Sequence, residues 1–272
     1  MTIDVQKAVS ISADLFRSVG TDLYPEILIS SLRSVASFDI FAIVNYPIGQ
    51  SPIFLYDNFP GLTSPGAMKA YVAGTYLLDP VYTACRSGAM GLRRFSDLTP
   101  DNYFESEYYI STDVHPCISS KPGAIAEEIV YIIQYEGGSS LVVSMMRLKS
   151  RSYFTNSEFS ILADLEPVIR QSAMKQWELP PLDASANKRP GRDASSELEV
   201  AFSEFASEAL SSREQSIVSF LLRGHSTLSV AMNLSIAEGT VKVHRRHIYE
   251  KLNISSQAEL FLLFCRHILR NN

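Results

Sequence analysis

The residues best suited to chemistry in this chain are cations that gather between positions 235 and 252 (SIAEGTVKVHRRHIYEKL). Their spacing predicts one helix with an inward stripe led by Val241, His244 and Ile248. The opposite face carries Gly239, Lys242, Val243, Arg246 and Glu250. Lysine and arginine contact guanine edges or phosphates, valine can touch a thymine methyl, and a bare glycine lets another surface come close. This combination is typical of a helix that lies in the major groove of DNA.

Shorter helices must hold this cationic helix in place. The pair Ser211/Glu214 has the spacing of a capping box and predicts a helix that Gly224 ends. Ser226 is expected to start a shorter helix, and the pair Ser235/Glu238 predicts a capping box at the start of the cationic one. A short helix, a tight turn and a longer basic helix form a helix-turn-helix, in which the second helix reads DNA.

A fourth helix is expected to start near Ser255 or Ser256 and is unusually apolar for so small a unit. We expect it to cover a partner as well as its own core, because contiguous exposed apolar surface marks interaction sites. The predicted dimerisation residues are Leu260, Leu263 and Phe264.

Together these residues resemble the DNA-binding domain of LuxR/FixJ-type (GerE-like) bacterial transcription regulators. The resemblance departs from the family at His247, where many members carry asparagine. It also covers only the carboxyl-terminal part of the chain, with the expected spacing throughout. The matched positions are Leu210, Arg213-Glu214, Gly224, Val230-Ala231, Leu234-Ser235-Ile236, Thr240-Val241-Lys242, His244, Ile248 and Lys251-Leu252.

The resemblance implies a transcription regulator and roles for single residues. The implied base-reading residues are Lys242, Val243 and Arg246. The residues implied to contact phosphates or to pack are Thr240, His244 and Arg245. Implied partners are double-stranded promoter DNA, a second copy of the chain and RNA polymerase. One module makes too few base contacts for specificity, so a homodimer would engage half-sites roughly 10 bp apart.

The alternative interpretation of the same segment is an ordinary four-helix module that packs against protein. Either His244 or His247 alone is more typical of a packing or capping residue than of a ligand contact. The structural context of the motif, more than the pattern itself, distinguishes the two interpretations.

Length, composition and charge are compatible with DNA binding. The 272 residues suggest two folded domains, with 46% hydrophobic and 19% charged residues. The net charge of -5 would disfavour nucleic acid, but its distribution reverses that inference. From Ser212 onward there are eight Lys or Arg against four acidic residues, a net charge of +4, and four of the five histidines. A basic end on an acidic protein is an electrostatic footprint for phosphate.

Cysteine usage and hydropathy indicate a cytoplasmic protein. Cys85, Cys117 and Cys265 are odd in number and form no CxxC pair, which fits buried thiols in a reducing compartment. The first residues are polar and show no signal-peptide core. No apolar run approaches the roughly 20 residues that span a bilayer, so no membrane partner is expected.

The front of the chain predicts an α+β sandwich, an antiparallel sheet flanked by helices. Residues 88–98 read as irregular and 111–123 as a loop. The predicted helices are 5–19, 23–35, 65–78, 80–86, 101–109 and a last one from 156 or 157 to 177. The predicted strands are 38–46, 53–56, 126–135 and 139–148, in two hairpins.

This order of elements resembles the GAF/PAS-like sensor half of LuxR-type regulators, which includes autoinducer-binding members. The predicted domains are a sensor and dimerisation domain at 1–177, a linker at 178–209 and a helix-turn-helix domain at 210–272. Within the linker, residues 197–209 (ELEVAFSEFASEA) could form an acidic helix with apolar marks at Phe202 and Phe205. That helix would either dock on the basic module or be a solvated face.

The stretch 71–82 (YVAGTYLLDPVY) carries the candidate ligand-binding residues, Tyr71 and Asp79. In LuxR-type quorum sensors an aspartate followed by proline accepts a hydrogen bond from the amide of an acyl-homoserine lactone, and Asp79-Pro80 matches it. The chain departs from those sensors because Trp177 is its only tryptophan. The alternative is a helix N-cap at Asp79 with Pro80 at the first helical position, and the two roles are compatible.

The sequence predicts neither catalysis nor a bound group. It contains no glycine-rich phosphate loop, no HExxH and no GxSxG, and its front part has one histidine, His115. We therefore expect no catalytic residue, no metal ligand and no cofactor. The competing predictions are a regulator that senses a small molecule, a ligand-independent regulator whose front domain only binds protein, and an enzyme with a DNA-binding tail.

Overall fold

The computed structural model describes residues 3–59, 65–111, 125–178 and 195–271, which form two compact units. The first unit comprises residues 1–59, 88–97 and 124–190. The second unit comprises residues 60–87, 98–123 and 191–272. Among the residues described, no helix has the length and apolar character that crossing a bilayer requires.

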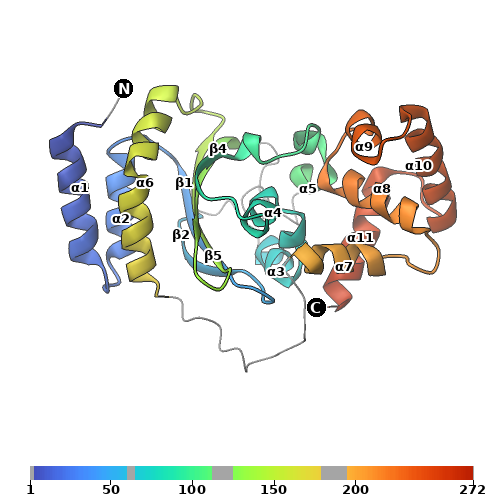
Figure 1. The fold of residues 1–272 in the computed structure, drawn as a ribbon, viewed down its shortest axis with the longest axis horizontal. Coiled ribbons are helices and arrows are strands. Elements are labelled where there is room, and N and C mark those ends of the chain that lie inside the picture. Colours follow the sequence, from blue (N-terminus) through green and yellow to red (C-terminus); the bar gives the residue numbers. More distant parts are fainter. Residues whose placement is uncertain (1–2, 60–64, 112–124, 179–194, 272) are drawn as a thin grey trace. The chain divides into compact units, whose positions relative to one another are not determined.

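A five-stranded antiparallel sheet forms the centre of the first unit (Figure 1). Its strand order is β2-β1-β5-β4-β3, so each predicted hairpin supplies one adjacent pair. Gly137 and Gly138 turn the second hairpin with φ of 92° and 87°, which favours glycine. The strands are β1 (Ile40–Tyr46), β2 (Ile53–Asp57), β3 (Gly91–Arg94), β4 (Ile125–Gln134) and β5 (Ser140–Leu148).

Three helices cover one face of this sheet: α1 (Val5–Ser18), α2 (Tyr24–Arg33) and α6 (Asn156–Gln176) (Figure 1). The Tyr24 hydroxyl lies 2.8 Å from the Ser172 hydroxyl, and its ring meets Trp177 edge-on at 5.3 Å. Thr155 and Glu158 form a capping box at the start of α6. These contacts join α2 to α6 and place the lone tryptophan in a structural role.

The α+β class predicted for the front of the chain is confirmed, with one local error. Residues 88–98 were expected to be irregular, yet Gly91–Arg94 forms β3 at a sheet edge. Its sequence, GLRR, has no hydrophobic alternation, and pairing with β4 defines it. A short 3-10 helix, η2 (Phe95–Asp97), follows. Residues 112–123 of the predicted loop, with His115 and Cys117, lie outside the described residues, as do residues 179–194 of the predicted linker.

The second unit is built from helices. The predicted helix at 65–78 is α3 (Pro65–Ala73) followed by the 3-10 helix η1 (Thr75–Leu78), and the one at 101–109 is two short pieces. Its earlier elements also include α4 (Pro80–Arg86), η3 (Tyr103–Glu105) and α5 (Glu107–Ile110). Its later helices are α7 (Ser195–Glu204), α8 (Ser212–Arg223), α9 (Thr227–Leu234), α10 (Glu238–Leu252) and α11 (Gln257–Asn271).

The apolar side of α11 packs against α7. Phe264 stacks on Phe202 with ring centroids 4.6 Å apart and meets Phe205 edge-on at 5.3 Å. Leu260 and Phe264 are fully buried, and Leu263 is half-buried. Leu260 and Phe264 are therefore core residues in this structure, contrary to the expectation of a dimerisation surface, and the rings of Phe202 and Phe205 contact Phe264. The dimer and the domain boundaries at 177, 209 and 210 stay predictions.

Candidate nucleic-acid interface

The cationic helix α10 begins at Glu238, three residues later than its sequence suggests. Ser235 has φ 53° and ψ 46° and closes α9, since its N–H donates to the carbonyls of Ala231 and Met232. The predicted capping box of Ser235 and Glu238 is therefore wrong, because a left-handed residue cannot also be an N-cap. Ala237 occupies the N-cap position without a side-chain hydrogen bond.

The two faces of α10 divide as its spacing predicts. Val241 and Ile248 are fully buried, and His244 is half-buried. Val243 is 46% exposed between exposed Lys242 and the cations that follow. The exposed residues of α10 are Glu238, Gly239, Thr240, Lys242, Val243, Arg246, His247, Glu250 and Lys251. A side chain at Gly239 would meet open space, so the surface there is free for a close approach.

The first turn of α8 holds both helices of the helix-turn-helix. Arg213 donates to the carbonyl of Leu234 at 2.7 Å, at the carboxyl end of α9. Lys251, near the carboxyl end of α10, donates to Glu214 at 2.7 Å. The Arg213-Glu214 pair thus fixes the angle between α9 and α10, a role that no local sequence signal reveals.

Glu214 is the buried centre of this arrangement. It caps α8 through the N–H and hydroxyl of Ser211, at 2.9 and 2.8 Å. Burial alone would raise the pKa of Glu214, but the hydrogen bonds from Lys251 and Ser211 outweigh it and lower the pKa to about 2. The capping box predicted at Ser211 is confirmed, and the carboxylate is charged at neutral pH.

The other two predicted helix boundaries are also confirmed. Gly224 ends α8 in the left-handed conformation at φ 92°. Ser226 starts α9, and its hydroxyl accepts from the N–H of Ser229 at 3.1 Å.

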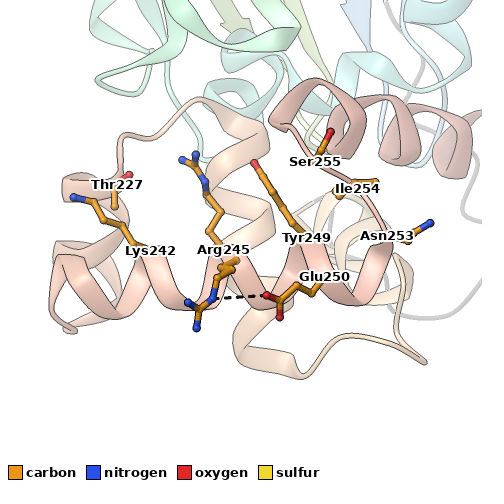
Figure 2. Close-up of a pocket in the computed structure, with 9 residues that line it drawn as sticks. Thr227, Lys242, Arg245, Tyr249, Glu250, Asn253, Ile254 and Ser255 are labelled. Atoms are coloured by element: carbon orange, nitrogen blue, oxygen red, sulfur yellow. Dashed lines mark ion pairs between the residues drawn. The ribbon is translucent and has the colours of Figure 1, made fainter.

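A hollow of about 580 Å³ lies along the cationic side of α10. Figure 2 shows Lys242, Arg245 and Tyr249 projecting from α10 on the side where Thr227 of α9 lies. The Arg245 guanidinium lies 5.6 Å from the centre of the Tyr249 ring. The residues that line the hollow are Thr227, Lys242, Arg245, Arg246, Tyr249, Glu250, Asn253, Ile254 and Ser255.

Tyr249 gives the hollow a hydrogen-bond donor as well as cations. Within the described part of the chain its buried hydroxyl makes no hydrogen bond. Burial raises the pKa of Tyr249, so the hydroxyl keeps its proton. A phosphate oxygen entering the hollow would supply the acceptor that this hydroxyl lacks.

Two acidic residues of α10 pair with the exposed cations. Glu238 lies 2.9 Å from Lys242, and Glu250 lies 3.8 Å from Arg246 (Figure 2). Both cations are 67% exposed. Exposed pairs of this kind contribute about 0.3–0.5 kcal/mol, so they do not prevent either cation from turning to a phosphate or a base.

The structure brings the candidate ligand residues Tyr71 and Asp79 into direct contact. The Tyr71 hydroxyl donates to one Asp79 oxygen at 2.7 Å, and the Val81 N–H donates to the other at 2.8 Å. Asp79 is therefore the N-cap of α4 with Pro80 at the first helical position, the alternative role that the sequence allowed. Burial raises the pKa of Asp79 to about 6, against the lowering effect of the Tyr71 and backbone hydrogen bonds.

Nothing in the described residues suggests a metal or catalytic centre. No group of three or more His, Cys, Asp and Glu among them could hold a metal ion. Among the described residues, Cys85 and Cys265 are buried and form no disulfide, and burial raises the pKa of Cys265 to about 12.

Comparison with known proteins matches the helix-turn-helix to a family. The model of "Bacterial regulatory proteins, luxR family" matches residues 208–264. A putative HTH-type transcriptional regulator from Aeromonas salmonicida is 34% identical over 145 residues, 53% of this chain and 74% of that protein. The response regulator protein TodT of Pseudomonas putida is 47% identical over 53 residues, 20% of this chain and 23% of that protein.

Two solved structures are more distantly similar. The VqsR LBD domain from Pseudomonas aeruginosa has 21% identity and a TM-score of 0.49, covering 63% of this chain and 94% of that one. SdiA in complex with octanoyl-rac-glycerol has 16% identity and a TM-score of 0.45, covering 97% and 96%. Neither likeness bears on what this chain binds.

Proposed function

We propose, on the premise that this chain belongs to the luxR family of bacterial regulatory proteins, that it is a dimeric, effector-responsive transcription regulator. Residues Lys242, Val243 and Arg246 of α10 read promoter DNA in the major groove. Thr240, His244 and Arg245 contact phosphates or pack against the residues that contact them.

The exposed face of α10 carries this proposal. An aliphatic side chain that is 46% exposed beside a lysine costs hydrophobic free energy in a free protein. In a major groove the same valine would contact a thymine methyl, and the cations would reach base edges and phosphates. The ion pair between buried Glu214 and Lys251 and the Arg213–Leu234 hydrogen bond hold this face in place.

Dimerisation is the second part of the proposal. With Leu260 and Phe264 in the core, the apolar surface that α11 offers a second copy is formed by Leu262 and Leu269, 53% and 42% exposed, beside the half-buried Leu263. Two copies would present α10 to successive major grooves, about 10 bp apart. Contact with RNA polymerase also stays a prediction.

Effector sensing is assigned to the second unit through Tyr71 and Asp79. The pair is buried, and the Tyr71 ring contacts the ring of Tyr76, which in turn contacts the ring of Tyr82. An effector with an amide N–H, of the acyl-homoserine lactone class, would donate to Asp79 alongside the Val81 N–H.

One observation favours the ligand-independent alternative. Both oxygens of Asp79 already accept a hydrogen bond within the chain, from Tyr71 and from Val81. Thermal unfolding with a series of acyl-homoserine lactones separates the two, because a ligand that binds only the folded state raises the melting temperature, and at a fixed concentration the rise grows with the logarithm of its affinity. An unchanged melting temperature across the series would favour a front domain that binds only protein.

DNA binding itself is tested with the full chain and a labelled 30-bp duplex pool of random sequence. Lys242→Ala and Arg246→Ala should each weaken binding, and the slope of log affinity against log salt should fall by about one for each lost phosphate contact. Arg17→Ala is the matched control, because Arg17 is also exposed and paired to a near carboxylate but lies on α1. If both variants bind as tightly as the parent, α10 does not contact DNA.

A further inference from the structure

Residues ahead of α5 dock on the turn between α8 and α9 within the second unit. Asp101 accepts hydrogen bonds from the Ser226 N–H at 3.0 Å and from the Ser226 hydroxyl. The Asn102 N–H donates to the carbonyl of Gly224 at 3.0 Å. A Cβ on Gly224 would lie 2.8 Å from the Tyr103 Cα, so the two backbones touch at a distance that only glycine allows.

The carboxylate of Asp101 lies where α9 is most receptive to an anion. The first N–H groups of a helix have no partner inside the helix, and the helix dipole favours negative charge there. Burial alone would raise the pKa of Asp101, but the Ser226 hydrogen bonds outweigh it and lower the pKa. Asp101 is thus an anion held at the start of the first helix of the helix-turn-helix.

DNA would need the same end of α9. In a helix-turn-helix the first helix crosses the DNA backbone, and helix N-termini donate to phosphate oxygens. Thr227, next to Ser226, lines the cationic hollow with Lys242 and Arg245 (Figure 2). A phosphate at this hollow would be next to the position that the Asp101 carboxylate holds.

A second acidic residue lies near Tyr249, which lines the same hollow. Glu107, in the first turn of α5, is close enough to Tyr249 to affect the pKa of that hydroxyl. Asp101 and Glu107 therefore place two negative charges at the edge of a surface whose other charges include Lys242, Arg245 and Arg246. Such charges repel a DNA backbone at this edge.

We propose that residues Asp101 to Glu107 form an autoinhibitory latch that competes with the DNA backbone for the amino end of α9. The proposal rests on the proposed function, since it presumes that α10 binds DNA. In the latched state Asp101 mimics a phosphate. Release of the latch gives DNA both the Ser226 donors and a surface without the two acidic side chains.

Helix α11 connects the latch to the elements that carry the candidate effector residues within the second unit. It contacts α3 and η1, which carry Tyr71 and Tyr76, and it contacts α5, whose first residue, Glu107, ends the latch. An effector that binds the released conformation more tightly would raise DNA affinity by no more than its difference in affinity for the two states. In this proposal the contacts of α11 thus link effector binding to DNA binding.

The test compares full-length Asp101→Asn with Glu105→Gln on the random 30-bp duplex. Glu105 is an exposed acid of the same segment, so its removal changes net charge without releasing Ser226. Asp101→Asn should raise DNA affinity about three- to tenfold, because it removes a charged hydrogen-bond partner at a partly exposed site. Glu105→Gln should change it less than about twofold, because salt screens an exposed charge.

Amide hydrogen exchange distinguishes the latch from a purely structural role of the same residues, because only a latch should open when DNA binds. In the parent, DNA should speed exchange in the peptide covering residues 98–110 while slowing it in α10. Equal or slower exchange of that peptide, or unchanged affinity in Asp101→Asn, overturns the latch even if Lys242→Ala weakens binding as proposed. If Lys242→Ala also leaves binding unchanged, the proposed function fails and the latch fails with it.

Discussion

Removal of the Lys251 ammonium should loosen the DNA-binding module from inside. In Lys251→Met the buried Glu214 carboxylate keeps its two Ser211 donors and loses its only donor from another helix among the described residues. A hydrogen bond to a charged group contributes about 1.5–3 kcal/mol. Because Lys251 is 44% exposed, solvent screens part of this contribution, and we expect a loss of about 1–2 kcal/mol in the free energy of unfolding.

The matched control is Lys242→Met on the same helix. Lys242 pairs with Glu238 at similar distance but is 67% exposed, and Glu238 is itself exposed. Breaking such a pair should change the free energy of unfolding by less than about 0.5 kcal/mol. The difference between the two variants isolates the effect of burying Glu214.

Urea unfolding can separate the two units, because the single tryptophan lies in the first. Trp177 fluorescence should show the same transition in parent and variant, whereas far-UV circular dichroism should show the helices of the second unit unfolding earlier. Double-mutant analysis with Glu214→Gln should give a coupling of about 1 kcal/mol or more for residues in direct contact.

The pH dependence provides an internal check on this prediction. The folded pKa of Glu214, about 2, lies below its ordinary 4.5, so its stabilising effect is present above about pH 4.5 and disappears as the pH falls toward 2. The difference between parent and Lys251→Met should therefore shrink below about pH 4. Equal stability of the two proteins at neutral pH would refute the inference that this pair holds α8 against α10.

Three further predictions concern stability and charge. As the pH rises from about 4 to 6, the parent should lose up to about 3 kcal/mol of stability, because the pKa of Asp79 is raised from 3.8 to about 6 in the folded state. Asp79→Asn should not show this loss, and parallel pH–stability curves for the two proteins would contradict the prediction. Glu250→Gln should tighten binding to random duplex about twofold or more by freeing Arg246, as measured by anisotropy; weaker binding would argue that Glu250 contacts a base. Gly224→Ala should destabilise the protein by more than about 1 kcal/mol in urea, whereas Gly239→Ala, which meets open space, should be neutral or stabilising.

Structural features that depend only on residues close together in the sequence could be predicted from it. The capping box at Ser211, the glycine stop at Gly224 and the N-cap at Ser226 are local patterns, and the structure confirms each. The division of α10 into a buried and a cationic face is likewise a property of spacing alone. The hairpin of β4 and β5 follows from two apolar runs separated by paired glycines.

Features that depend on distant residues could not be predicted in the same way. Ser235 and Glu238 have the spacing of a capping box, but closure of α9 requires a left-handed backbone at Ser235. The Glu214–Lys251 pair spans 37 positions, and the contact between Asp101 and Ser226 spans 125. The burial of Phe264 likewise depends on Phe202 and Phe205, which lie about 60 positions earlier in the chain.

The central claim is that Lys242 of α10 reads a base, and sequence selection tests it most directly. Full-length parent and Lys242→Ala would each be used to enrich binders from a duplex pool with a randomised centre. The parent should enrich a pair of half-sites about 10 bp apart, and the variant should lose preference at one position in each half-site while keeping the others. An identical motif for both proteins would contradict the account.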